Sequence, residues 1–172
     1  MILITDGDYN EQAFCGFMAG VLMEDFDSEE ISGFVTVEIS EIGAYESGAF
    51  YKRELSGVKS LLSKLNLSQI QCVVVDGYAV FGDGEHISLG ERVFAEYGIP
   101  VIGIAKSHNL FCKIEDTEVF RGKSQTPLFV TAIGMELAYA KEKVKSMFGE
   151  HRIPYGVKIA DSLARKHRVI LN

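Results

Sequence analysis

The sequence predicts an α/β domain in which helices flank a mixed sheet, with three antiparallel strands followed by parallel strands. Two observations predict this class. The N-terminal part holds three β-type segments joined by short polar connections, which is typical of an antiparallel meander. Further along, continuous apolar runs alternate with amphipathic helical stretches, as in parallel sheets with crossover helices. The chain has 172 residues, 47% of them hydrophobic, so we expect one domain spanning residues 1–172 with its own core.

The first half of the chain supplies the meander and one helix. We expect strands at residues 2–5, 13–23 and 31–39, the last of them rich in β-branched side chains around Val35 and Val37. Over residues 54–65, apolar side chains recur at spacings of three and four, which predicts a helix with one buried stripe.

The second half alternates strands and helices. The apolar run 72–75 predicts a strand buried on both faces, and the run 100–105 predicts another. Between them, Ser88 and Glu91 have the spacing of a capping box that opens a helix, which Gly98 closes. A strand at 128–131, a helix at about 136–148 and a last helix at 159–166 complete the expected order.

Charge is unevenly distributed along the chain. Residues 1–120 carry 7 Lys and Arg against 20 Asp and Glu, whereas residues 121–172 carry 10 against 4. The first part is therefore acidic and the second basic, within a total net charge of −7. The basic section could grip phosphates, with Lys141 and Lys145 as candidate contacts, although such a run is equally typical of a solvated helix face.

Cysteine usage and hydropathy bear on location. The three cysteines are odd in number, far apart and flanked by apolar residues, which favours free thiols over disulfides. No apolar run approaches the ~18 residues of a membrane span, and the opening residues lack the features of a signal peptide. We therefore expect a cytoplasmic protein with no membrane partner.

Charged side chains stand where the expected strands and helices end. Asp6 and Asp76 follow apolar strands, Glu54 opens the first expected helix, and Lys106 follows the strand 100–105. Strand ends border the crevice where α/β sheets bind ligands, and convergent carboxylates hold Mg²⁺ or Mn²⁺. Such an ion activates water and neutralises charge on a phosphoryl group. Taken singly, each residue also suits a turn or a helix start.

Taken together, the motifs resemble those of the endonuclease V family, and they cover nearly the whole chain in order. In the first half of the chain, segment 6–9 resembles the family's Asp-x-x-Tyr, 45–48 its Tyr-Ile-Pro-Gly, 52–54 its Phe-Arg-Glu and 75–77 its Val-Asp-Gly. In the second half, segment 99–107 resembles Ile-Pro-x-Ile-Gly-Val-Ala-Lys-Ser, 152–154 resembles Arg-Leu-Pro and 160–164 resembles Ala-Asp-x-Leu-Ala. The resemblance implies a ribonuclease H-like fold and a nuclease that uses Mg²⁺ or Mn²⁺ to cut DNA or RNA near inosine.

The resemblance also implies roles for particular residues. Asp6 and Asp76 would be the metal-binding aspartates and Glu54 the third acidic residue, with Lys106 at the scissile phosphate. The nucleic acid would be contacted by a strand-separating wedge and by two glycines that close around an extruded base, namely Tyr45, Gly48 and Gly77.

The chain also departs from the family's motifs. Glu-Ser follows Tyr45 in place of Ile-Pro, and an acidic, glycine-rich stretch at 81–85 replaces a His-Pro-Arg segment. Met135 stands where the family has a metal-site histidine. Glu136 is then a further candidate ligand, while Met135 could simply be part of the core. Two alternatives therefore stay open beside the nuclease: a non-catalytic member that binds nucleic acid or protein, and a phosphatase for a small metabolite.

Overall fold

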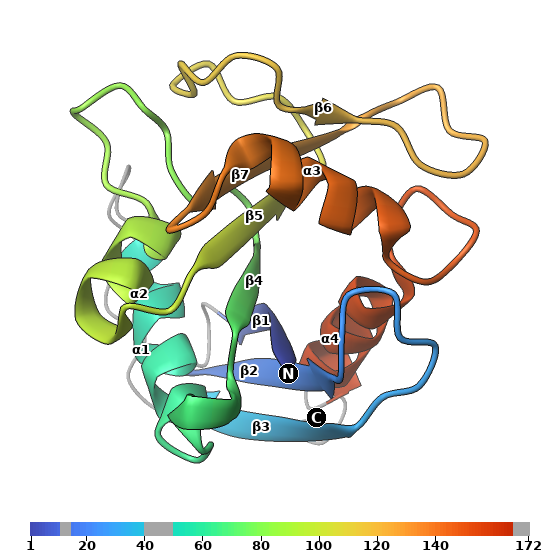
Figure 1. Ribbon diagram of the computed structural model, residues 1–172. Coiled ribbons are helices and arrows are strands. Elements are labelled where there is room, and N and C mark those ends of the chain that lie inside the picture. Colours follow the sequence, from blue (N-terminus) through green and yellow to red (C-terminus); the bar gives the residue numbers. More distant parts are fainter. Residues whose placement is uncertain (11–14, 40–49, 167–172) are drawn as a thin grey trace.

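A computed structural model describes residues 1–10, 15–39 and 50–166, and all of its strands lie in one seven-stranded sheet. The sheet has the order β3-β2-β1-β4-β5-β7-β6, with helices on both faces (Figure 1). Strands β1, β4 and β5 are parallel to one another, and the remaining pairs are antiparallel. The predicted mixed sheet of three antiparallel strands followed by parallel strands is confirmed.

The N-terminal meander forms as the sequence predicts, but its first strand is longer. Strands β1 (Ile2–Asn10), β2 (Cys15–Met23) and β3 (Gly33–Ile39) pair antiparallel in this order. β1 does not end before Asp6, because the polar stretch that follows continues to pair with β2 as far as Asn10. Asp6 therefore lies inside a strand, where its backbone is fixed by the ladder.

The centre of the sheet carries short, apolar strands. β4 (Cys72–Asp76) and β5 (Val101–Ala105) are connected through α2 (Leu89–Tyr97). The capping box is present: Glu91 N–H donates to Ser88 Oγ at 3.1 Å, and Ser88 N–H donates to Glu91 Oε2 at 2.8 Å. Gly98 ends the helix in the left-handed conformation, with φ 67°, as its position predicted.

The remaining elements differ from the expectations mainly at their ends. Helix α1 is Phe50–Leu62, so it begins before Glu54, and a 3-10 turn, η1 (Leu67–Gln69), precedes β4. The C-terminal part contains β6 (Glu118–Val119), β7 (Leu128–Ile133), α3 (Leu137–Ser146) and α4 (Tyr155–Lys166). The sequence pattern gave no sign of β6, because two paired residues are too few to show alternation.

The sheet separates two hydrophobic layers. Alternate side chains of β1 and β4 point to opposite faces, so Ile4 and Val74 pack beneath α3 and α4, whereas Leu3 and Val73 pack beneath α1 and α2. Cys72 is buried and the other two cysteines are half-buried, and all three are free thiols, as expected. Within the described ranges, none of the helices has the length and apolarity to cross a membrane.

Candidate active site

Strand register brings three of the predicted residues to one edge and one face of the sheet. Thr5 pairs with Val75 in the parallel ladder, so Asp6 and Asp76 are the next residues on neighbouring strands. Asp76 pairs with Ile104, and Lys106 is two residues further on, just beyond β5. Side chains alternate along strands, so all three project to the face that carries Ile4, Val74 and Ile104, the face covered by α4.

Lys106 and Asp76 form an ion pair at this edge. Lys106 Nζ donates to Asp76 Oδ2 at 2.8 Å, and both side chains are partly exposed. Burial lowers the pKa of Lys106, but the hydrogen bond to Asp76 and the charges of Asp76, Asp6 and Asp161 outweigh burial, so the net shift of its pKa is upward. Lys106 is therefore a fixed cation in an acidic surrounding.

Asp6 is a buried carboxylate with an unused oxygen. Only 8% of the residue is exposed, and Asp6 Oδ1 accepts the Gly7 N–H at 2.7 Å. Asp6 Oδ2 is buried and has no hydrogen-bond partner among the described residues. Burial, together with the charges of Asp76 and Asp161, raises the pKa of Asp6 from 3.8 to about 6. A buried oxygen of this kind is costly unless a partner satisfies it.

Glu54 reaches the same site from the opposite layer. It lies near the N-terminal end of α1, the helix that packs on the meander face. Burial, followed by the charges of Asp76 and Asp6, raises the pKa of Glu54 from 4.5 to about 8. Glu54 is therefore within electrostatic reach of both aspartates.

Asp161 is a further carboxylate at this site, and the residue-by-residue reasoning missed it. It lies on α4, packed against β1, and its charge acts on both Asp6 and Lys106. Its Oδ1 accepts Arg165 Nε at 2.9 Å, so a cation on the same helix partly compensates it. The sequence does contain a motif that could have identified Asp161, because this residue belongs to the segment 160–164 that resembles the family's Ala-Asp-x-Leu-Ala.

The residues at this edge fit a hard divalent cation in their donor chemistry. Carboxylate oxygens are the ligands that Mg²⁺ and Mn²⁺ take, and a cation would satisfy the unpartnered Asp6 Oδ2. Mutual repulsion between Asp6, Asp76 and Glu54 is also relieved by a cation. In the part of the chain that the structure describes, three or more such ligands are not gathered into a closed cluster, so the side chains would have to turn toward the ion.

Glu136 does not join this site, which corrects the suggestion that it replaces a lost histidine. β7 runs antiparallel to β5, so its last residue, Ile133, pairs with Val101 at the opposite end of β5 from Lys106. Glu136 follows there as the exposed N-terminal cap of α3. Met135 packs partly buried against the core beneath α3 and α4, in agreement with its interpretation as a core residue.

A cavity of about 380 Å³ opens beside the carboxylates. Glu54, Asp76 and Gly77 line it together with aromatic side chains from the segments 78–89 and 109–111. Gly77 has φ 114°, a conformation that disfavours side chains, and a Cβ there would meet nothing within 4 Å. Of the three nucleic-acid contacts that the resemblance implies, Gly77 therefore lies at the cavity, whereas Tyr45 and Gly48 lie outside the described residues.

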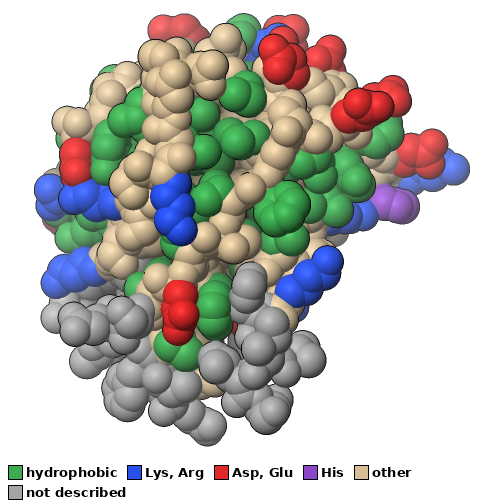
Figure 2. All heavy atoms as spheres, turned by 90° about the horizontal axis from the view of Figure 1, so that it is seen from below, with side chains coloured by type: hydrophobic (Ala, Val, Ile, Leu, Met, Phe, Trp, Pro, Cys, Tyr) green, Lys and Arg blue, Asp and Glu red, His purple; other side chains and the backbone are tan. Residues whose placement is uncertain are grey.

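One of the two candidate lysines in the basic C-terminal section makes an ion pair within the protein. Lys141 Nζ pairs with Asp116 Oδ1 at 2.7 Å, and its side chain is only 17% exposed. Lys145 is exposed at the end of α3. Figure 2 shows one face of the molecule, with most of its visible acidic side chains along one rim and basic side chains across the middle.

Comparison with solved structures was decisive for the fold. Endonuclease V from Ciona intestinalis, solved with a 24mer DNA that contains an inosine followed by a ribo-adenosine, is 18% identical and superposes with a TM-score of 0.80 over 99% of this chain and 87% of that one. The chain has the endonuclease V fold. Human ENDOV is 18% identical with a TM-score of 0.80, over 99% of this chain and 85% of the human one.

A bacterial endonuclease V shows the same likeness. The Streptomyces avermitilis enzyme is 23% identical, with a TM-score of 0.77 over 99% of this chain and 82% of that one. No protein-family model and no curated protein matches the chain in sequence. The resemblance to endonuclease V and the predicted ribonuclease H-like fold class are both confirmed by structure, at a low level of sequence identity.

Proposed function

We propose that the protein is a metal-dependent nuclease that hydrolyses a phosphodiester bond near deaminated purines, such as inosine, in DNA or RNA. The observation that carries the proposal is the proximity of three acids to the ion pair of Lys106: the charge of Asp76 helps to raise the pKa of Asp6, and the charges of Asp76 and Asp6 help to raise the pKa of Glu54. Perturbed acids of this kind beside a cavity are typical of functional sites. The likeness to solved endonuclease V structures supports the proposal.

The carboxylates have separate parts in the proposed reaction. Asp6 and Asp76 would hold Mg²⁺ or Mn²⁺, and Glu54 would approach the ion directly or through a water molecule. When bound, the ion supplies charge neutralisation and a more acidic water. In the metal-free protein the raised pKa keeps Glu54 largely protonated near neutral pH, and a bound cation would favour its ionised form. Asp161 would add negative charge that strengthens ion binding.

Lys106 would bind the phosphate at the cleaved bond. Its Nζ already lies beside Asp76, so a phosphate oxygen near the acids would meet a positive charge held in place. Arg152 supports this arrangement: Nη2 donates to the Lys106 carbonyl, and to the Pro127 carbonyl at 2.7 Å. These contacts fix the backbone that carries Lys106.

Further contacts with nucleic acid would come from several regions. We assign Lys145 as a phosphate contact because it is exposed, and Lys141 as a weaker one because Asp116 already pairs with it. Gly77 would let a base approach the cavity. Tyr45 and Gly48 keep the wedge and base-contact roles that the resemblance implies.

The test is a cleavage assay on matched oligonucleotides. Single and double strands of DNA and RNA, each with inosine or adenosine at one position, are incubated with Mg²⁺, with Mn²⁺ or with EDTA. We expect metal-dependent cleavage of the inosine strands, and no cleavage by the Asp6→Asn protein. Binding without cleavage at any metal concentration would favour the non-catalytic alternative.

A second assay separates the phosphatase alternative. Release of inorganic phosphate from small phosphorylated metabolites, with no cleavage of any oligonucleotide, would overturn the nuclease proposal. A Lys145→Glu variant tests the phosphate contact, because we expect it to reduce the salt dependence of oligonucleotide affinity by about one unit of slope.

A further inference from the structure

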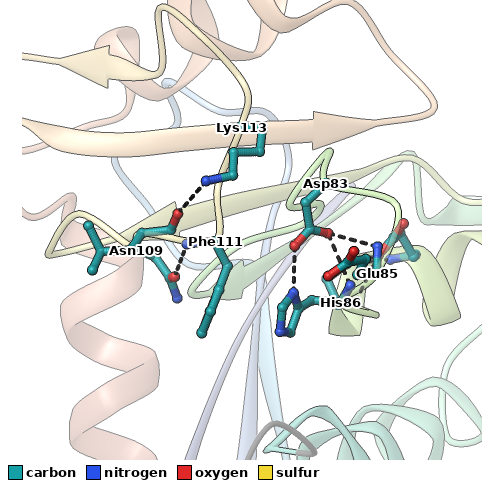
Figure 3. Close-up of polar contacts among 9 residues, drawn as sticks. Asp83, Glu85, His86, Asn109, Phe111 and Lys113 are labelled. Carbon is teal, nitrogen blue, oxygen red and sulfur yellow. Dashed lines mark hydrogen bonds and ion pairs between the residues drawn. The ribbon is translucent and has the colours of Figure 1, made fainter.

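Two aromatic side chains from different loops stack at the mouth of the cavity. Phe111, in the loop between β5 and β6, is 51% exposed. Its ring lies 4.1 Å from the His86 ring, centroid to centroid, at an angle of 24°. His86 belongs to the loop between β4 and α2, and both rings line the cavity that Glu54 and Asp76 share. Figure 3 shows the two rings pointing the same way from their separate loops.

His86 is fixed by its own loop. Its Nδ1 lies 2.5 Å from Asp83 Oδ2, and its ring makes an edge-to-face contact with the Phe81 ring, with the two centroids 6.3 Å apart. Asp83 Oδ1 also accepts the backbone N–H groups of Glu85 and His86, at 3.1 and 3.0 Å (Figure 3). These backbone and side-chain hydrogen bonds lower the pKa of Asp83 to about 2, so Asp83 remains charged and continues to hold the imidazole.

The two loops are also tied to each other. Tyr78 Oη donates to the Ser107 carbonyl at 3.1 Å and accepts the Asn109 N–H at 3.0 Å. The Lys113 N–H donates to the Phe81 carbonyl at 2.8 Å. The Phe111 N–H donates to Asn109 Oδ1 at 2.9 Å, which fixes the backbone that carries the ring. The stacked pair is therefore organised before any ligand arrives, so little conformational entropy remains to be lost on binding.

We propose that Phe111, backed by His86, is a stacking platform for an unpaired base of the bound strand. The inference rests on the proposed nuclease function, because the cavity that these rings line is the one that reaches Glu54 and Asp76. His86 stacks against the Phe111 ring, and the Phe111 side chain stays half-exposed where it lines the cavity, so that it remains accessible to a base. A base lying on such a ring gains stacking energy whatever its identity.

The platform defines the substrate class as a strand with unpaired bases. In a duplex, each base already stacks on its neighbours, so it must be extruded before it can lie on Phe111. Extrusion of the base costs less free energy in a single strand, in a loop or at the end of a duplex. The acidic residues Asp83 and Glu85, in the loop that carries His86, would repel the phosphate backbone of the second strand of a duplex.

The experiment measures binding without turnover. Affinities of fluorescein-labelled deoxyinosine oligonucleotides, single and double stranded, are measured by anisotropy in EDTA for the parent protein and for Phe111→Ala, Phe111→Trp and Phe120→Ala. Phe120 is a matched control because it has the same 51% exposure and does not line the cavity. We expect Phe111→Ala to weaken single-strand binding roughly 5- to 100-fold, Phe111→Trp to restore it, and Phe120→Ala to leave it unchanged.

An abasic scan measures whether the effect of Phe111→Ala on affinity depends on one particular base, which a merely structural role of Phe111 would not produce. Each nucleotide around the inosine is replaced in turn by an abasic one. At the position that stacks on Phe111, the abasic oligonucleotide should bind the parent and Phe111→Ala equally, because the interaction is then missing in both. A 2-aminopurine at that position should be quenched by the parent and less by Phe111→Ala.

The outcomes separate the two proposals. Parent binding and cleavage that Phe111→Ala leaves unchanged would overturn the platform while the nuclease stands. An equal loss of affinity at every abasic position would also overturn it, because the effect would then not depend on a base. Absence of parent binding to every strand would overturn the platform and the nuclease together.

Discussion

Lys106 Nζ lies 2.8 Å from Asp76 Oδ2, so the cation that follows β5 neutralises the carboxylate that ends β4. Asp76 ends β4 and Lys106 directly follows β5, the neighbouring parallel strand, so the two side chains are brought together by the sheet. A metal ion that approaches Asp76 therefore meets an ammonium group already in place. In the proposed mechanism, ion binding and phosphate binding would be coupled through this one pair.

The pair predicts opposite effects for its two members. Asp76→Asn keeps the shape of the side chain but removes a ligand charge, so we expect Mg²⁺ affinity and cleavage to be lost together. Lys106→Ala removes a competing cation, so we expect Mg²⁺ affinity to be kept or raised while turnover falls by roughly 100-fold. Calorimetric titration with Mg²⁺ and single-turnover cleavage measure the two effects. Equal losses of Mg²⁺ affinity in both variants would contradict this division of roles.

Stability of the metal-free protein should fall as the pH rises. Folded Glu54 and Asp6 have raised pKa values, about 8 and about 6, so the folded state holds protons that the unfolded chain has lost. The free energy of unfolding should therefore decrease from about pH 4 to about pH 8. Glu54→Gln should remove much of this decrease, and so be more stable than the parent by roughly 1–3 kcal/mol at pH 8 and little different at pH 4.

Urea denaturation in EDTA across this pH range measures the effect. Added Mg²⁺ should raise the melting temperature of the parent more at pH 8 than at pH 5, because protons compete with the ion for the same oxygens. A stability of the parent that is flat with pH would show that the acids are not coupled as described.

Arg121 is predicted to be a stability residue and not a phosphate contact. Only 5% of it is exposed, and its guanidinium donates to carbonyl groups at the end of α3 and in the loop beyond, those of Lys145, Met147, Gly149, His151 and Arg152. Arg121→Met leaves these carbonyls unsatisfied, so we expect a loss of roughly 2–4 kcal/mol in unfolding free energy.

A surface ion pair provides the control for Arg121. Lys59 pairs with Glu96 at 2.8 Å, but both side chains are over 40% exposed. Lys59→Ala should change the free energy of unfolding little, because water screens an exposed ion pair. Chemical denaturation compares the two variants. A similar small cost for both would mean that water replaces the guanidinium at those carbonyls.

The strand and helix pattern could be predicted from the sequence because local signals agreed with the tertiary structure. The capping box at Ser88 and the left-handed Gly98 are local signals, and both were found where expected. The continuation of β1 beyond Asp6 was not visible, because polar residues there are held by pairing with β2 and not by burial. β6 was also missed, since its pairing with β7 is a long-range event.

The site was predictable to the extent that register could be inferred. Asp6, Asp76 and Lys106 follow apolar runs, and parallel pairing then brings such ends together. Glu136 was misplaced because its position depends on the direction of β7, which the sequence does not state. The Phe111–His86 stack joins two loops and has no periodic signal at all.

Gly103 is predicted to couple the core to the site. It lies in β5, where an added Cβ would meet Ala79 N at 2.2 Å and Gly77 O at 2.6 Å, both of them backbone atoms. Gly103→Ala must therefore push away the segment that follows Asp76, and we expect a loss of roughly 2–4 kcal/mol in unfolding free energy together with weaker Mg²⁺ binding. Gly33→Ala is the control, because its Cβ would meet only Leu22 Cδ1 at 3.8 Å, an ordinary contact. Thermal denaturation and Mg²⁺ titration of both variants give the answer. If Gly103→Ala binds Mg²⁺ as the parent does, the 77–79 segment does not position Asp76.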